Sequence, residues 1–165
     1  MRKRAWLTSI CGGRFVVPIG RLDKDSTGLI LLTTNESVTG ALLRPGDEGS
    51  PLSKVYLVET RRRVQTSFIE RMREGGLELS IRDWKHKDEK VKTKPCGVER
   101  LSERVLRFEL REGKNRQIRK MLGSAGHAVK HLHRIAFGPI ELGDLKLNEM
   151  ELLTDQQVEA LLKHV

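Results

Sequence analysis

A short polar loop between Gly20 and Gly28 carries two aspartates, Asp23 and Asp25, and leads into an apolar segment that begins at Leu29. A carboxylate held beside apolar chain can act as a nucleophile, a base or a metal ligand. The D-x-D spacing is compatible with a metal-dependent transfer of a phosphoryl or sugar group, although no further carboxylate cluster supports it. The spacing is equally compatible with turn chemistry, in which Asp, Ser and Thr side chains bond nearby backbone N–H groups. The loop alone leaves these alternatives open.

The segment from Gly113 to Arg134 is basic, with six Lys/Arg residues, three histidines and no Asp or Glu. The whole chain of 165 residues carries 31 Lys+Arg against 22 Asp+Glu, a formal net charge of +9. An excess of this size favours a polyanionic partner, because phosphate contacts release counterions. A solvated helix face would explain any single lysine equally well. The charge pattern therefore indicates nucleic acid as the partner and residues 113–134 as the binding face.

Arg119 differs from the other cations of this segment. Apolar residues recur there at i, i+3, i+4 and i+7, which predicts a helix with Asn115 as its N-cap and Gly126 at its end. On a wheel of about 100° per residue, Arg116 and Lys120 point away from the apolar stripe, whereas Arg119 lies at its border. A border arginine can reach into a cleft and meet a buried carboxylate, or it can cover the core with its methylene groups. The wheel does not decide between these roles.

The elements expected to hold the aspartate loop are short. Residues 15–19 and 29–34 are apolar and bounded by Gly or polar residues, which predicts two strands that flank the loop. Asn35 is a suitable cap for a short helix that stops at the Arg-Pro-Gly turn of residues 44–46. The aspartates are therefore expected in a connection between two strands.

The remaining elements include a strand at 54–60, in which Lys54, Tyr56 and Val58 share one face. Residues 105–111 alternate between apolar and charged side chains, which is typical of a strand with one buried face. Further expected elements are a helix at 67–74, a charged loop or hairpin tip after it, a strand at 128–137 and a helix opened by a capping box at Thr154–Gln157. Strands and helices without strict alternation predict one α+β domain with a mixed sheet.

Several classes of protein are not supported by the composition. The longest apolar run has about four residues, far below the roughly 20 that cross a bilayer, so we expect a soluble intracellular protein. Cys11 and Cys96 stand alone in the sequence, without zinc-type spacing, and are expected to be inert thiols. The cysteines therefore predict neither a disulfide framework nor a structural metal.

Three segments resemble a known enzyme family in their order and spacing. They are VVPIGRLDKDSTGLILLTTN at 16–35, KVYLVE at 54–59 and LREGKNRQIRKM at 110–121. Together they are similar to pseudouridine synthases of the RsuA-like branch, which modify ribosomal RNA. The resemblance implies a mixed, mostly antiparallel sheet with flanking helices and a central RNA-binding cleft. It also implies an isomerase that acts on RNA without a cofactor or metal.

The same resemblance implies three catalytic residues. Asp23 of the RLD loop would be the catalytic aspartate, with Asp25 a loop residue, and Arg119 would keep the Asp23 carboxylate ionised in a desolvated pocket. Tyr56 would stack on the base near the proton to be removed from C5, although a half-buried strand tyrosine needs no such role. Arg21 would lie near the space that the flipped base leaves. The expected RNA-binding residues are Arg21, Lys54, Lys114, Arg116, Gln117, Lys120, Lys130 and Arg134.

The expected domain organisation is a basic segment at 1–14, disordered or truncated, and a catalytic domain at 15–165. The S4-type RNA-binding domain that usually begins members of this branch has no counterpart before Gly20. We expect a monomer that binds RNA, in particular ribosomal RNA, and that does not bind a membrane. The expected compartment is the cytoplasm of a bacterium, or a plastid or mitochondrion of a eukaryote. The alternative function is a catalytically inactive RNA- or ribosome-binding module with the same fold.

Overall fold

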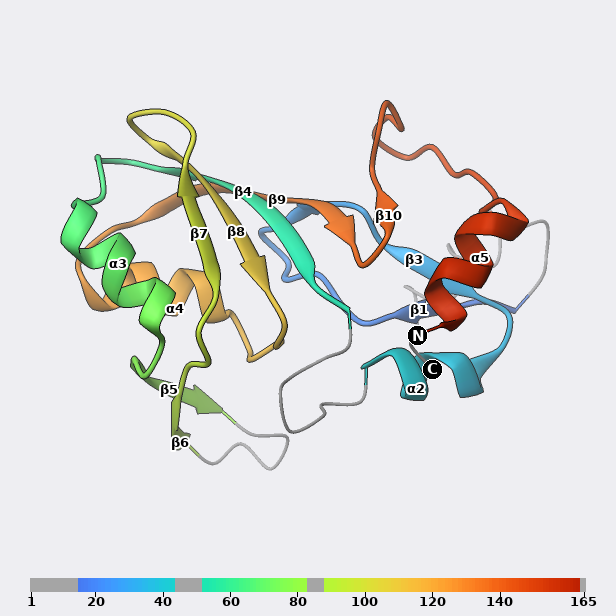
Figure 1. Ribbon diagram of the computed structural model, residues 1–165, viewed down its shortest axis with the longest axis horizontal. Coiled ribbons are helices and arrows are strands. Elements are labelled where there is room, and N and C mark those ends of the chain that lie inside the picture. The colour runs from blue at the N-terminus through green and yellow to red at the C-terminus, as the bar shows by residue number, and fades with distance from the viewer. Residues whose placement is uncertain (1–14, 44–51, 83–87, 164–165) are drawn as a thin grey trace.

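The computed structural model describes residues 15–43, 52–82 and 88–163 (Figure 1). Its central feature is a mixed sheet in which all pairings but one are antiparallel. The exception is the short strand β2 (Thr27–Gly28), which runs parallel to β9. The main path of the sheet, in spatial order, is β10 (Ile140–Glu141), β9 (Val129–Phe137), β4 (Lys54–Thr60), β8 (Val105–Leu110) and β7 (Gly97–Arg100). The expected α+β fold with a mixed, mostly antiparallel sheet is confirmed.

One half of the sheet is covered by two helices, α3 (Thr66–Glu74) and α4 (Gln117–Ser124). The alternation of β8 turns Leu106, Phe108 and Leu110 inward, and these side chains join the apolar stripes of both helices in one buried cluster. A smaller hairpin, β5 (Glu78–Arg82) with β6 (Asp88–Lys92), packs at the edge of this half (Figure 1). The charged loop or hairpin tip expected after α3 therefore belongs to a hairpin, and its residues 83–87 lie outside the described part.

A second core lies at the other end of the molecule. The hairpin of β1 (Val17–Ile19) and β3 (Leu31–Thr33) packs there with α2 (Glu36–Leu43) and α5 (Asp155–Leu162) (Figure 1). The buried side chains come from segments far apart in sequence and include Ile19, Leu42, Leu52, Phe137 and Leu161. Strands β4 and β9 run from the first core to the second, so the two halves share one sheet.

Local signals in the sequence explain where several helices begin. Asn35 Oδ1 accepts the backbone N–H of Ser37 at 3.1 Å ahead of α2, and the Thr154–Gln157 capping box is present at α5. The prediction of Asn115 as the cap of α4 is wrong, because the helix begins one residue later with Arg116 in the cap position. Arg116 has φ 53, a left-handed conformation that costs energy in a residue with a side chain.

Cys96 is a free thiol, while Cys11 lies outside the described residues. Burial, together with the negative charge of Glu112, raises the pKa of the Cys96 thiol to about 11. The thiolate is the reactive form of cysteine. The raised pKa therefore agrees with the expectation of an inert side chain at Cys96.

Candidate active site

A cleft of about 630 Å³ lies between the two cores. The aspartate loop forms one side of it, β4 contributes Lys54 and Tyr56, and residues 112–118 form another side. Asp23 and Tyr56 therefore line the same cavity although they are 33 positions apart in the chain. Of the RNA-binding residues expected from the sequence, those that line the cleft are Arg21, Lys54, Lys114, Arg116, Gln117 and Arg134.

The aspartate loop is held in the cleft by its pairing with β9. Thr27 and Gly28 pair with His133 and Arg134, and Leu29 N donates to Arg134 O at 2.8 Å. Thr27 Oγ1 also lies 2.8 Å from His133 Nδ1. At its tip the loop turns tightly, with Ser26 N donating to Asp23 O at 3.0 Å. The loop is therefore hydrogen-bonded to the main sheet and is not a free surface connection.

Gly28 makes this pairing possible. Its φ is +104, and a Cβ at this position would lie under 3.0 Å from three backbone atoms of Arg134. Both the backbone conformation and the close approach exclude a side chain. The glycine five residues after Asp23 thus sets how closely the aspartate loop approaches the sheet.

Two arginines near the start of α4 bind the loop through Asp25. Arg116 Nη1 lies 3.2 Å from Asp25 Oδ2, and Arg119 Nη2 donates to Asp25 O at 2.5 Å. The side chain of Arg119 therefore reaches the aspartate loop, as its border position on the helix suggested. The contact is with the backbone of Asp25, and among the described residues no salt bridge joins Arg119 to the Asp23 carboxylate. The two aspartates differ in surroundings, since Asp23 lines the cleft and Asp25 is paired with Arg116.

Arg134 is buried between the aspartate loop and the sheet and does not lie on an exposed binding face. It is 1% exposed, its Nε donates to Leu29 O at 2.7 Å, and its Nη1 donates to Arg21 O at 3.5 Å. The guanidinium also lies over the Phe137 ring, 5.4 Å from the centroid. Residues 113–134 therefore do not form one exposed face, because Arg134 is buried against the aspartate loop while it lines the cleft.

Lys54 is the other buried cation of the cleft. It is 8% exposed, and its Nζ lies 5.3 Å from the centroid of the Phe137 ring. Burial, with the neighbouring charge of Arg134, lowers the pKa of Lys54 from 10.5 to about 8. The amine is thus still charged at neutral pH, but keeping this charge buried costs free energy. A bound phosphate or carbonyl oxygen would offset this cost.

Glu112 organises the wall formed by residues 112–118, and the sequence reasoning missed it. Its Oε1 accepts the backbone N–H of Lys94 at 3.0 Å and also an N–H of the Gln117 amide, while its Oε2 is paired with Lys114. Gln117 Oε1 in turn accepts the backbone N–H of Lys114 at 3.1 Å. One largely buried carboxylate thereby positions a lysine and a glutamine of the cleft. The available signal was an acidic residue immediately before a long basic segment.

Two of the expected RNA-binding residues lie outside the cleft. Lys120 Nζ is 3.5 Å from Asn115 Oδ1 on the exposed side of α4. Lys130 Nζ pairs with Glu59 Oε1 at 2.8 Å at the far end of β4.

Among the described residues, no group of three or more His, Cys, Asp or Glu side chains is placed to hold a metal ion. The described residues also contain no helix long and apolar enough to cross a membrane.

Comparison with known proteins identifies the family to which this chain belongs. The sequence profile of the RNA pseudouridylate synthase family matches residues 7–124, which is most of the chain. The chain belongs to this family. Its fold is also similar to a crystal structure of a pseudouridylate synthase, with a TM-score of 0.78 and 30% sequence identity over 92% of this chain and 61% of that one.

Curated pseudouridine synthases are similar along most of this chain. The chain is 36% identical over 148 residues to the dual-specificity RNA pseudouridine synthase RluF of Escherichia coli K12, covering 90% of this chain and 47% of that protein. It is 29% identical to the ribosomal large subunit pseudouridine synthase B of Bacillus subtilis, covering 88% of this chain and 57% of that protein. The chain thus spans about half the length of the curated relatives it matches. The cleft of this family member contains Asp23, Tyr56 and Lys54.

A pH-dependent stability is expected from Lys54. Between pH 8 and 10.5 the unfolded chain holds a proton that the folded chain has lost, so the free energy of unfolding rises with pH across this window. Below pH 8 both states are protonated, and the buried charge costs at most about 3 kcal/mol. Lys54→Met should therefore raise the free energy of unfolding at pH 7 and abolish its increase with pH. Urea unfolding at pH 7 and pH 9.5 measures both effects, and exposed Lys92→Met is the control. An increase in Lys54→Met equal to that of wild type would contradict the lowered pKa of Lys54.

Proposed function

We propose that this chain is an RNA pseudouridine synthase that isomerises uridine to pseudouridine, with ribosomal RNA as its substrate and Asp23 as its catalytic carboxylate. The observation that carries the proposal is the meeting of Asp23 and Tyr56 in one basic cleft of a pseudouridine synthase fold. The names of the curated relatives support the reaction, and that of the Bacillus subtilis relative supports the large ribosomal subunit as a source of substrate. We further propose that residues 15–165 form the catalytic domain and act as a monomer.

The reaction breaks the bond between N1 of uracil and C1′ of ribose, turns the base, and joins C5 to C1′. A proton leaves C5 and N1 gains one, so no outside atom, oxidant or reductant enters. The Asp23 carboxylate would either attack C1′ or take a ribose proton to give a glycal, and both routes need it ionised beside the sugar. Tyr56 would stack on the base near C5. The target base would first have to leave its stack, and exposed Arg21 would lie near the space it vacates.

The proposed roles of Lys54, Lys114, Arg116 and Gln117 follow from their place in the cleft wall. Cations there would hold phosphates on either side of the flipped nucleotide. Glu112 would position Lys114 and Gln117 for this contact. The network also explains how an acidic residue is compatible with an RNA-binding surface, since both of its oxygens are already engaged.

Pseudouridine mapping tests the reaction directly. Purified protein incubated with ribosomal RNA fragments should introduce pseudouridine at defined uridines, detected by mass spectrometry or by chemical mapping. Transfer RNA and a scrambled RNA of equal length serve as controls for substrate choice. Specific binding without any product on a full set of ribosomal RNA fragments would favour the inactive RNA-binding module instead.

Arg119 should contribute to turnover more than to binding. Its guanidinium donates to Asp25 O in the loop that carries Asp23, so Arg119→Ala should let this loop move and lower single-turnover rates by about 10²-fold. Lysine should restore activity only in part, because it lacks the planar fork of the guanidinium. Single-turnover rates at saturating protein, with equilibrium binding of the same RNA, separate the two effects. A loss confined to binding would make Arg119 a phosphate contact only.

A further inference from the structure

A second basic surface lies at the end of β4 that points away from the cleft. We call it the distal basic surface and define it by Arg61, Arg62, Arg63, Arg104, Lys130 and His131, all of which are exposed. These residues come from three segments, which follow β4, precede β8 and begin β9. They meet because β8 and β9 both run antiparallel to β4, so that the end of β4 pairs with the start of each.

A buried threonine fixes the backbone of this surface. Thr60, which is 1% exposed, donates its hydroxyl to Arg62 O at 2.7 Å, and the same hydroxyl lies 3.3 Å from Arg104 O. Thr60 N donates to Arg104 O at 2.9 Å, and Arg61 N donates to Ala128 O at 3.0 Å. The segments that carry the cations are thus tied to one another and to the sheet. An ordered backbone lowers the entropy lost when the arginines bind a ligand.

The charge of this surface is only partly neutralised within the protein. Glu59 pairs with Lys130, and this hydrogen bond, with the charges of His131 and Arg104, lowers the pKa of the Glu59 carboxyl. Glu103, the exposed residue before Arg104, is the other acidic residue next to this surface in the sequence. Within the described residues, none of the three consecutive arginines, Arg61 to Arg63, takes part in a salt bridge. Their charge is therefore available to an external anion.

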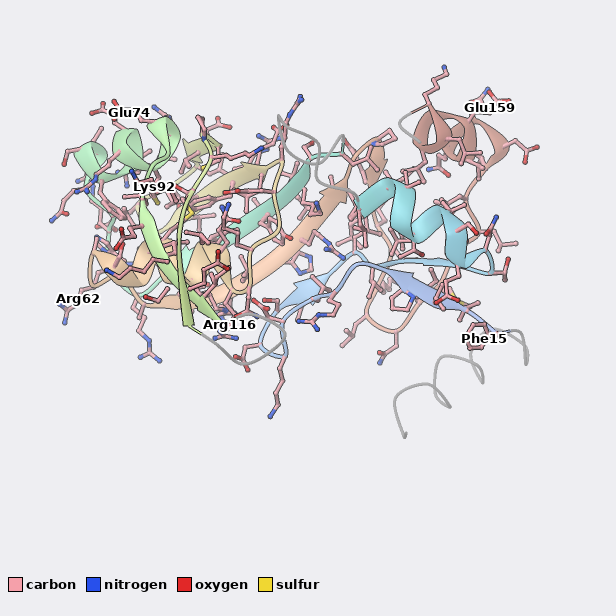
Figure 2. All side chains as sticks on the ribbon, turned by 90° about the horizontal axis from the view of Figure 1, so that it is seen from below. Phe15, Arg62, Glu74, Lys92, Arg116 and Glu159 are labelled. Carbon is pink, nitrogen blue, oxygen red and sulfur yellow. The ribbon has the colours of Figure 1, made fainter. Side chains whose placement is uncertain are left out.

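The distal basic surface lies too far from the cleft to act mainly through the electrostatic field of the cleft. Tyr56 lines the cleft and Thr60 is four positions further along the same strand, which spans about 13 Å at about 3.3 Å per residue. The Debye length at physiological ionic strength is about 8 Å, so exposed charges at this distance hardly alter the field in the cleft. In Figure 2 the labelled Arg62 and Arg116 lie along the same side of the molecule, Arg62 towards one end and Arg116 nearer the middle.

We propose that the distal basic surface binds the phosphate backbone of an RNA stem that flanks the target nucleotide while that nucleotide occupies the cleft. The inference rests on the proposed function for the presence of RNA in the cleft. A stem fits better than a single strand, because sequence-independent sites for single strands place aromatic rings against the bases. None of the residues that define the surface is Phe, Tyr or Trp, and exposed Phe15 is at the opposite end of the molecule (Figure 2).

Binding of two RNAs to one triple variant tests the proposal. The variant combines Arg61→Gln, Arg62→Gln and Arg63→Gln, and its charge-matched control combines Lys92→Gln, Lys146→Gln and Lys163→Gln at exposed sites elsewhere. One RNA is a short single-stranded oligonucleotide with the target uridine, and the other carries the same nucleotides in the loop of an extended stem. The arginine variant should bind the stem-loop at least about tenfold more weakly, with a log–log salt slope smaller by about 2. It should bind the short oligonucleotide within about twofold of wild type.

The outcomes that overturn the proposal are an equal loss on both RNAs, or a loss no larger than that of the lysine control. A second pair of variants tests the anchoring: Thr60→Ser should retain stem-loop affinity, and Thr60→Val should lower it in a protein whose folding is checked by urea unfolding. Because every readout is binding, the result does not depend on pseudouridine formation. If the arginine variant loses stem-loop binding but the wild-type protein forms no product, the proposed reaction is refuted and the distal basic surface stands. If the wild-type protein forms product but the arginine variant binds the stem-loop as well as wild type, the distal basic surface is refuted and the reaction stands.

Discussion

Asp23→Asn should lower the single-turnover rate of pseudouridine formation by at least about 10³-fold. Asparagine keeps the size of the side chain but supplies no negative charge and no nucleophilic oxygen, so neither attack on C1′ nor removal of a ribose proton remains possible. RNA affinity should stay within about threefold of wild type, because the proposed phosphate contacts of the cleft come from other side chains. Rates at saturating protein and equilibrium binding, measured on one RNA, give both quantities.

Asp25→Asn is the matched control for this variant. Both aspartates lie in the same loop, but the Asp25 carboxylate pairs with Arg116 whereas Asp23 lines the cleft. Asparagine keeps a side-chain oxygen that can accept from Arg116, and the backbone carbonyl that binds Arg119 is unchanged. We expect less than about a tenfold loss of rate. Near wild-type activity of Asp23→Asn, or equal losses in both variants, would refute Asp23 as the catalytic carboxylate.

Gly28→Ala should be nearly as damaging to activity, by a different route. A methyl group there would collide with the backbone of Arg134, and φ +104 is unfavourable for any residue with a side chain. Relief of the collision requires β2 to move away from β9, which displaces Asp23 as well. A displacement of about 1 Å at a reacting group can lower a rate by about 10²-fold, and strain of this kind destabilises by about 3 kcal/mol or more.

Gly40→Ala provides the control for Gly28→Ala. Gly40 lies in α2, and a Cβ added there would meet no atom within 4 Å, so alanine should stabilise the helix by up to about 1 kcal/mol and leave the rate unchanged. Urea unfolding and single-turnover rates of the two variants compare the stability and the activity. A Gly28→Ala protein with native stability and rate would show that the aspartate loop does not depend on its close approach to β9.

The elements with strong local signals were predictable. The strand at 54–60 agrees with β4 in both bounds, and the alternation of 105–111 correctly indicated β8 and its buried face. The capping box of α5 is equally local, because its two hydrogen bonds join residues three positions apart. The start of α4 was missed by one residue, because the cap position is occupied by Arg116 in a left-handed conformation, which no capping preference predicts.

For the site, the amino-acid sequence alone established a basic chain with carboxylates in a loop before a buried strand, a tyrosine beside a lysine, and an arginine at the border of a helix. Which of these meet depends on the folded chain: parallel pairing with β9 brings the aspartate loop to Tyr56, and Arg119 reaches that loop through Asp25 O. Folding also buries Arg134 and gathers Arg61 to Arg63 with Lys130 at the far end of the sheet. The physical reason is range, since periodicity and capping act over a few residues whereas strand pairing, burial and charge depend on partners that lie about a hundred positions away.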